Sequence, residues 1–292
     1  MFLILISTLI FTVRASFKPV IMMHGVGSDA GEMNTIERLL KERDNSTLVT
    51  SLPLYEGQPN SWDHNLQEQV DGVIDAVKNL IAESPEAYAD GYHFVCKSQG
   101  AVTCRAVIES WSDHNVTNFV SLAGPQSGVY GKAYFESLKY LPDWLVGTTT
   151  EEIYLVAYTS LGQDISVGNL WRDPNHLQDF LDKDKFLPKY TEKATEEMKT
   201  NFLKLEKAVF CVGSGHAYDG GIEPWQTGVF GSVVDGQMLN MTQRDFYIKD
   251  SFGLKTLDES GRLELTIVPD VSHNDWTGNE DVIHKYVLPH CT

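Results

Sequence analysis

The chain has 292 residues, of which 42% are hydrophobic, enough to bury a full core as one large domain or as one domain with an insertion. Its 23 Lys and Arg residues stand against 40 Asp and Glu residues, which gives a formal net charge of −17. A surface this acidic repels phosphate backbones, so we expect no nucleic-acid partner. The pI near 4.8 suits an acidic compartment, where protonation lowers the net charge.

The first 15 residues, MFLILISTLIFTVRA, have the pattern of a secretory signal peptide. They carry no charge before Arg14, and the apolar run is shorter than the roughly 20 residues that span a bilayer. The alternative is a buried N-terminal strand. Glycosylation sequons at Asn45, Asn115 and Asn240 favour the secretory route. No other apolar stretch reaches transmembrane length, so we expect a soluble mature protein that is lumenal or secreted.

Strand and helix patterns alternate along the rest of the chain. Short apolar or β-branched runs predict strands at residues 18–23, 47–52, 92–96, 116–122, 207–212 and 263–268. Helices are predicted at residues 33–43, 65–81, 99–111 and 280–288. This alternation predicts an α/β fold of the α/β-hydrolase type, with a mainly parallel sheet covered by helices on both faces.

The pattern is less regular from about residue 128 to residue 205. Aromatic residues are frequent in this segment, and prolines and polar stretches interrupt it. We interpret it as a cap of short helices inserted into a single domain that spans residues 16–292.

The sequence FVCKSQG at residues 94–100 resembles the Gly-x-Ser-x-Gly motif of a nucleophile elbow. Ser98 follows a predicted strand and opens a predicted helix, as the elbow requires. The residues beside the serine must be small, because strand and helix pass close together. Gly100 meets this need, whereas Cys96 stands where the first glycine is expected. The alternative is a strand end that happens to carry a serine.

The order of polar residues along the chain favours the elbow. α/β-Hydrolases present their catalytic residues in the order Ser, Asp, His. Asp219 follows the strand predicted at residues 207–212, and His273 lies in the loop after the last strand. His273 would act as general base and then as general acid, with Asp219 fixing its tautomer. Asp270 and Asp275 flank His273 and remain rivals for the role of the acid.

An oxyanion hole is predicted in the glycine-rich loop at residues 24–27. The backbone N–H groups of Val26 and Gln99 would point at the developing oxyanion. The alternative is an ordinary glycine-rich turn. We expect His24 to be structural and to hold this loop.

Four cysteines occur in the chain: Cys96, Cys104, Cys211 and Cys291. An even number in an oxidising compartment suggests disulfides, and four cysteines allow three connectivities. No CxxC pair occurs, so the spacing predicts no zinc site. We expect no metal and no cofactor.

These motifs closely resemble the palmitoyl-protein thioesterases, and the second, lysosomal type in particular. The most specific matching stretches are SLAGPQSGVYG at residues 121–131 and DSFGLKTL at residues 250–257. The resemblance implies Ser98 as nucleophile, Asp219 as acid and His273 as base. It also implies a soluble lysosomal hydrolase that cleaves fatty acyl thioesters.

The resemblance also bears on the cysteines. It implies a Cys96–Cys104 disulfide that ties the elbow strand to its helix. The chain departs from the family in the cap, where Ala157 and Gly168 occupy the places of a cysteine pair. Cys291 falls outside the family spacing, and a Cys211–Cys291 bridge remains open.

We therefore predict a serine hydrolase for long-chain fatty acyl thioesters, such as palmitoyl-CoA or S-acylated proteins. One alternative is a lipase or carboxylesterase that acts on oxygen esters. Another is a catalytically silent lipid-binding protein on the same fold. The predicted location is the lysosome, reached through the secretory pathway, with secretion as the alternative.

Overall fold

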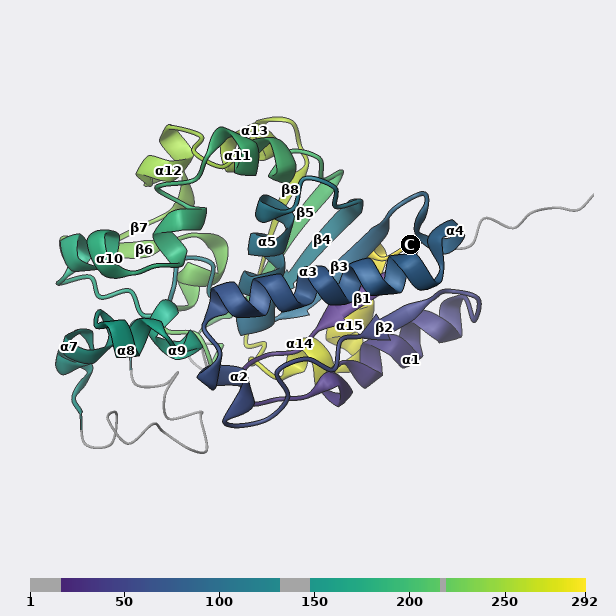
Figure 1. Cartoon of the computed structure of the whole chain (residues 1–292), viewed down its shortest axis with the longest axis horizontal. Helices are drawn as coiled ribbons and strands as arrows, with labels where there is room; N and C mark the ends of the chain where they lie inside the picture. Colours follow the sequence, from purple (N-terminus) through teal and green to yellow (C-terminus); the bar gives the residue numbers. More distant parts are fainter. Residues whose placement is uncertain (1–16, 132–147, 216–218) are drawn as a thin grey trace, which may run out of the picture.

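The computed structural model describes residues 17–131, 148–215 and 219–292, and it is organised around a parallel sheet of six strands (Figure 1). The strand order is β2-β1-β3-β4-β5-β8, as the predicted α/β-hydrolase fold requires. The strands are β1 (Val20–Met23), β2 (Val49–Ser51), β3 (Tyr92–Lys97), β4 (Val116–Leu122), β5 (Lys207–Ser214) and β8 (Leu263–Pro269). The expected signal peptide at residues 1–15 lies outside the described residues.

Helices cover both faces of the sheet. One face carries α3 (Leu66–Glu83), α4 (Pro85–Tyr88) and α5 (Gln99–Ser110); the other carries α1 (Asn34–Arg43), α14 (Asp275–Gly278) and α15 (Glu280–Tyr286) (Figure 1). Successive side chains of a strand point to opposite faces. Accordingly, Ile21 and Met23 of β1 pack into the core with α3 and α5, whereas Val20 and Met22 pack into the core with α1 and α15.

Helix α3 shows how local sequence sets an element. Asn65 caps its first turn, because the Asn65 side chain accepts a hydrogen bond from the Glu68 N–H at 3.0 Å. Val70, Val73 and Val77 recur at helical spacing and are fully buried against the sheet. The observed helix starts and ends within two residues of the predicted range.

All six predicted strands are present, but the sequence interpretation missed a hairpin. It consists of β6 (Ser232–Val234) and β7 (Gln237–Leu239), which pair in antiparallel fashion. Asp235 and Gly236 form the turn, both with positive φ, as the Asp-Gly hairpin signal demands. That dipeptide could have revealed the hairpin. The helices α12 (Asp245–Ile248) and α13 (Leu254–Glu259) that follow it were not predicted either.

Short helices fill the described part of the expected cap. They are η3 (Thr150–Glu152), α7 (Tyr154–Ala157), α8 (Ser160–Gln163), α9 (Ser166–Asn169), α10 (Leu177–Lys183), η4 (Leu187–Tyr190) and α11 (Glu196–Phe202). Residues 132–147 of the expected cap lie outside the described residues. Within the described ranges, no helix is long and apolar enough to cross a membrane.

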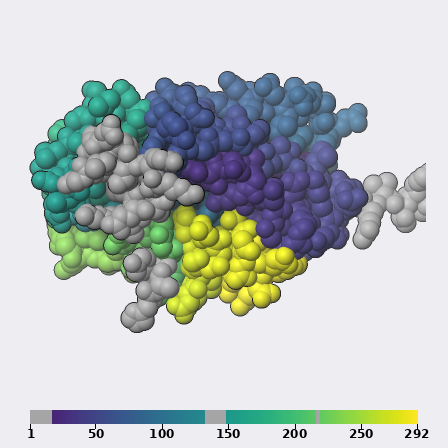
Figure 2. All heavy atoms as spheres, turned by 90° about the horizontal axis from the view of Figure 1, so that it is seen from below, coloured from purple at the N-terminus to yellow at the C-terminus, as the bar shows by residue number. Residues whose placement is uncertain are grey.

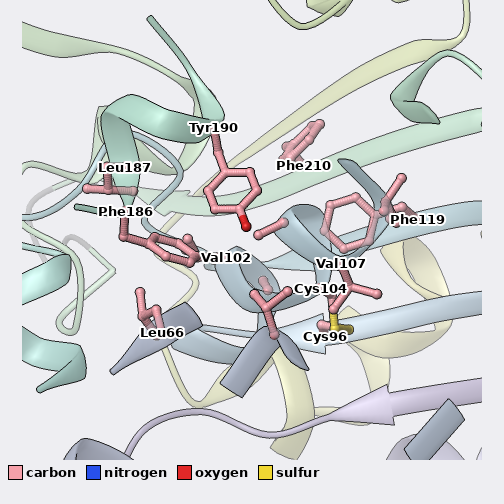
Figure 3. Packing of buried hydrophobic residues seen from close by; sticks show 14 of the residues in the cluster. Leu66, Cys96, Val102, Cys104, Val107, Phe119, Phe186, Leu187, Tyr190 and Phe210 are labelled. Carbon is pink, nitrogen blue, oxygen red and sulfur yellow. A yellow bond between two sulfur atoms is a disulfide. The ribbon is translucent and has the colours of Figure 1, made fainter. Parts of the chain in front are cut away.

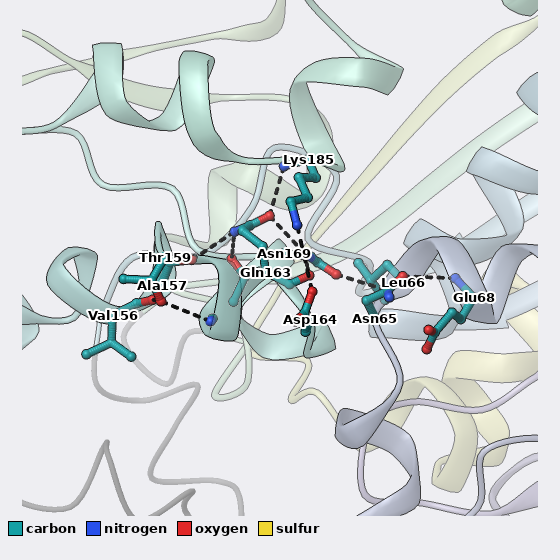
Figure 4. Close-up of polar contacts among 12 residues, drawn as sticks. Asn65, Leu66, Glu68, Val156, Ala157, Thr159, Gln163, Asp164, Asn169 and Lys185 are labelled. Atoms are coloured by element: carbon teal, nitrogen blue, oxygen red, sulfur yellow. Dashed lines mark hydrogen bonds and ion pairs between the residues drawn. The ribbon is translucent and has the colours of Figure 1, made fainter.

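A buried amide joins the cap helices at Ala157 and Gly168, the positions where the resemblance implied a cysteine pair (Figure 4). The side-chain N–H₂ of Gln163 donates to the carbonyl oxygens of Ala157 at 2.9 Å and of Gly168 at 3.2 Å. A Cβ atom on Gly168 would lie 1.9 Å from the carbonyl oxygen of Gly162, so a cysteine does not fit there without a backbone shift. Hydrogen bonds thus connect these two segments in place of a covalent link.

The same network fastens the cap to the sheet domain (Figure 4). Asn169 donates to Gln163 Oε1 at 3.0 Å and accepts from the Leu66 N–H at the start of α3 at 2.9 Å. The Lys185 N–H also donates to Gln163 Oε1, at 2.8 Å. Replacing Gln163 would therefore remove its hydrogen bonds to the Ala157 and Gly168 carbonyls, to Asn169 and to the Lys185 N–H.

We predict that Gln163→Leu lowers the free energy of unfolding by about 2–4 kcal/mol, because it removes this set of hydrogen bonds at a buried side chain. Chemical denaturation followed by circular dichroism measures the loss. Gln178→Leu is the matched control, because Gln178 is exposed and, within the described part of the chain, its side chain bonds only Asp182 on its own helix. We expect a change within about 0.5 kcal/mol for the control. Equal effects of the two variants would contradict this account of the cap.

Candidate active site

Ser98 lies between β3 and α5 in a backbone conformation that few residues other than glycine adopt. Its φ is 53° and its ψ is −128°. The Ser98 N–H donates to the carbonyl oxygen of Leu122 on β4 at 2.8 Å, which anchors the turn to the sheet. Strained residues of this kind cluster at functional sites. The residue is 5% exposed, so the turn is part of the packed interior.

The residues around Ser98 are small because the chain segments touch. A Cβ atom on Gly100 would lie 2.2 Å from the carbonyl oxygen of His24. A Cβ atom on Gly25 would lie 2.9 Å from Ser98 Cβ and 3.5 Å from Ser98 Oγ. The glycine-rich loop after β1 therefore lies directly against the elbow.

Cys96 and Cys104 form a disulfide, as the family resemblance implied. Their Cα atoms are 6.6 Å apart, and the bond joins the end of β3 to α5. Figure 3 shows it among buried side chains of α5, Val102 and Val107, and beside Phe119 of β4. The disulfide thus fixes the strand and the helix that flank Ser98.

The bridge left open between Cys211 and Cys291 is not formed. Both cysteines are free and buried. Burial raises the pKa of the Cys211 thiol well above its ordinary value and that of Cys291 to about 12. Such thiols remain protonated and behave as small apolar side chains.

Asp219 and His273 form a hydrogen-bonded pair. His273 Nδ1 lies 2.5 Å from Asp219 Oδ1, and the His273 N–H donates to the Asp219 carbonyl oxygen at 2.5 Å. Asp219 is fully buried, and its Oδ1 also accepts from the N–H of Ile222 at 3.1 Å. A Cβ atom on Gly221 would lie 2.6 Å from the His273 ring, so the imidazole packs against this turn.

The rival carboxylates do not contact His273. Asp275 Oδ2 accepts from the N–H and the hydroxyl of Ser272, at 2.8 and 2.7 Å. Asp270 lies in the exposed turn at the end of β8, beside Gly215. Of the three candidates, the structure brings only Asp219 into hydrogen-bond contact with the imidazole.

No hydrogen bond joins Ser98 Oγ to His273 Nε2 among the described residues. The loops that carry them do touch, because Lys97 Nζ donates to Asn274 Oδ1 at 3.1 Å. These two residues adjoin Ser98 and His273 in the chain. Catalytic hydrogen bonds are often long in ligand-free enzymes and tighten in the substrate complex.

In the predicted oxyanion loop, the N–H groups on either side of Val26 are bonded to side chains. The Gly25 N–H donates to Glu32 Oε2 at 3.0 Å, and the Gly27 N–H donates to Ser61 Oγ at 2.7 Å. The N–H groups of Val26 and Gln99 have no partner within the described residues. The two predicted oxyanion donors are therefore available to a ligand.

Three other histidines, His24, His114 and His176, have contacts that explain their positions. The two ring nitrogens of His24 each lie 2.9 Å from a carbonyl oxygen, those of Gly25 and Leu54, so His24 holds the loop as expected. His114 is buried and bridges two backbone groups. His176 stacks on Tyr154 with ring centroids 3.5 Å apart.

The sequence interpretation missed Glu32 and Lys97. These side chains form an ion pair beside Ser98, and Lys97 is 2% exposed. A lysine inside an otherwise apolar strand, next to the candidate nucleophile, was the available signal. Its partner could not be read from the sequence. No group of three or more His, Cys, Asp or Glu side chains within the described ranges could hold a metal ion.

Comparison with known families identifies the chain. The model of the palmitoyl protein thioesterase family matches residues 19–273. The chain belongs to this family. Membership makes the protein a thioester hydrolase.

Individual relatives agree with this assignment, and a solved structure agrees with the fold. The chain is 34% identical to the lysosomal thioesterase PPT2 of Homo sapiens over 94% of its length and 88% of that protein. It is 30% identical to the PPT2 homolog of Drosophila melanogaster, over 96% and 93% of the two chains. The crystal structure of Bacillus licheniformis lipase BlEst2 has a similar fold, with a TM-score of 0.52 and 15% identity over 96% and 94%.

We predict that Gly25→Ala lowers the rate of acyl thioester hydrolysis by about tenfold or more, because the new methyl group displaces Ser98. Steady-state turnover of palmitoyl-CoA measures the effect, and a melting curve checks the fold. Gly278→Ala is the control, since a Cβ atom there meets nothing within 4 Å. An active Gly25→Ala variant would show that the contact does not constrain Ser98.

Proposed function

We propose that the protein hydrolyses long-chain fatty acyl thioesters through an acyl-enzyme formed on Ser98. The observation that carries the proposal is the buried Asp219–His273 hydrogen bond at 2.5 Å, in a chain whose elbow serine is strained and tightly packed. Family membership supports the thioester as the bond that is cleaved.

In the first step, Ser98 Oγ attacks the carbonyl carbon of the thioester while His273 Nε2 takes the hydroxyl proton. Asp219 accepts from His273 Nδ1–H and stabilises the imidazolium that forms. The oxyanion is bound by the N–H groups of Val26 and Gln99. The C–S bond then breaks, and the thiol leaves with the proton from His273.

In the second step, water hydrolyses the ester on Ser98. His273 Nε2 takes a proton from the water as it attacks the acyl carbon. The tetrahedral intermediate collapses, and Ser98 Oγ regains its proton from the imidazolium. The fatty acid is released and the free enzyme is restored.

We place the protein in the lysosome, reached through the secretory pathway. Relatives named lysosomal thioesterases support this location. The asparagines of the three sequons, Asn45, Asn115 and Asn240, are all exposed, so a glycosyltransferase could reach each of them. Glycosidase treatment of the secreted protein tests for the modification by a shift in mass.

Oxygen esters are the alternative substrate, because nothing in a Ser-His-Asp arrangement excludes them. Hydrolysis rates measured side by side on palmitoyl-CoA and on a palmitoyl oxygen ester of matched solubility distinguish the two substrate classes. We expect the thioester to turn over faster. Faster turnover of the oxygen ester would contradict the proposed substrate class.

We predict that Ser98→Ala and His273→Ala each lower kcat by about 10³-fold or more, and that Asp219→Asn loses somewhat less. Single-turnover kinetics with palmitoyl-CoA measure the loss. Labelling by a fluorophosphonate probe should disappear in Ser98→Ala. Unchanged turnover in Ser98→Ala would overturn the mechanism, and a wild type without labelling or turnover would favour a silent lipid-binding protein.

A further inference from the structure

Lys97 is a cation buried between the disulfide and the candidate nucleophile. It follows Cys96, precedes Ser98, and its side chain is 3% exposed. A buried ammonium group is costly unless a partner and further hydrogen bonds compensate it. The contacts of Lys97 should therefore show what holds it in this place.

Two partners from distant parts of the chain meet Lys97. Its Nζ is hydrogen-bonded to Glu32 Oε1 in an ion pair and donates to Asn274 Oδ1 at 3.1 Å. Glu32 belongs to η1 (Ala30–Met33), which follows the oxyanion loop. Asn274 follows His273. One ammonium group thus touches the segments on both sides of the elbow.

The second oxygen of Glu32 reaches the oxyanion loop. Glu32 Oε2 accepts from the Gly25 N–H at 3.0 Å. Because the Gly25 N–H is fixed on this carboxylate, the adjoining peptide that carries the Val26 N–H is held in orientation as well. The carboxylate therefore divides its two oxygens between the lysine and the loop.

The packing of the surrounding elements agrees with these contacts. η1 packs against α14, so N-terminal and C-terminal residues meet at this face of the molecule. Figure 2 shows the purple N-terminal and yellow C-terminal parts side by side. Lys97 connects β3 to both of these parts of the chain, through Glu32 and Asn274.

Charge keeps this carboxylate ionised. Burial raises the pKa of Glu32, but Lys97, the Gly25 N–H and the charge of His273 outweigh burial, and the pKa lies below its ordinary value. The interaction with His273 also means that the carboxylate and the imidazole lie near one another. Glu32 is thus a fixed negative charge close to the candidate base.

We propose that Lys97 and Glu32 are a pair of positioning residues that hold the oxyanion loop, the elbow serine and the His273 loop in their catalytic arrangement. The inference rests on the proposed roles of Val26, Ser98 and His273. Within the described residues, neither side chain of the pair is hydrogen-bonded to Ser98 Oγ or to the His273 ring. A purely structural ion pair would instead affect stability and leave the chemical step unchanged.

The first test compares Lys97→Met, Glu32→Gln and the double variant. We expect each single change to lower kcat on palmitoyl-CoA by about tenfold or more, with KM within about twofold, because alignment is lost and substrate binding is not. The double variant should lose about as much as the worse single variant, since both residues act through one contact. If the kcat losses of the two single variants multiply in the double variant, the two residues act separately, and the proposed pair is overturned.

The control is a second carboxylate that is shared between a lysine and a backbone N–H. Asp250 accepts from Lys199 at 2.8 Å and from the Thr256 N–H at 3.2 Å. Asp250→Asn should lower the melting temperature and leave kcat unchanged. If Asp250→Asn and Glu32→Gln lower kcat equally for the same loss of melting temperature, Glu32 has no positioning role.

The pH profile gives a signature that a merely structural role would not produce. The charged or polar groups that face Glu32 are Lys97 from β3, His273 from the loop after β8, and the Gly25 N–H. Without Lys97, the burial of Glu32 is less opposed and the pKa of this carboxyl rises. The loss of kcat in Lys97→Met, relative to wild type at the same pH, should therefore grow as the pH falls, whereas that of Glu32→Gln stays constant. A constant deficit in Lys97→Met would contradict the proposed coupling.

Asn274→Ala keeps the inference testable if the buried variants fail to fold. Asn274 is exposed, and this change removes only the contact between Lys97 and the His273 loop. We expect a fall in kcat of about threefold or more with no loss of melting temperature. Unchanged kcat in Asn274→Ala would overturn the link to His273.

The activity of the wild type separates failure of the inference from failure of the proposed function. A wild type without thioesterase activity would overturn both. A wild type that is active, with all variants equally active, would overturn only the inference.

Discussion

The site depends on the backbone of Ser98, which is held at a φ of 53° between a buried strand and a buried helix. This conformation is unfavourable for serine, so the surrounding structure must compensate it. Gly25 and Gly100 let the loop after β1 approach the turn, and the Ser98 N–H is bonded to β4. The close packing that strains the serine also brings the loop that carries Val26, a predicted oxyanion donor, against it.

Strand β3, which ends next to Ser98, is linked to neighbouring elements on both faces of the sheet. Side chains alternate along a strand, so Cys96 and Lys97 point in opposite directions. Cys96 is bonded to Cys104 of α5 on one face, and Lys97 meets Glu32 and Asn274 on the other. A covalent bond and a buried ion pair thus act on neighbouring residues. Together they oppose movement of Ser98 toward either layer of helices.

Local patterns were sufficient to predict the six strands and the order of Ser98, Asp219 and His273, because apolar periodicity and motif spacing are local properties. The hairpin was missed although its Asp-Gly turn was readable. The pairing of Lys97 with Glu32 could not be predicted, because 65 residues separate them and any acidic residue was a possible partner. Asp219 was preferred over Asp270 and Asp275 because it follows a strand of its own, and the folded chain adds its hydrogen bond to His273.

The Lys97–Glu32 pair also suits an acidic compartment. A carboxyl group with a depressed pKa contributes stability that is fully present above its unfolded pKa and is lost as the pH falls through the folded pKa. For Glu32 this loss begins only below its ordinary value of 4.5. Across the weakly acidic range the carboxylate therefore keeps its charge, its lysine and its hold on the Gly25 N–H. The loop that carries Gly25 is then held by a contact that keeps its charge throughout this pH range.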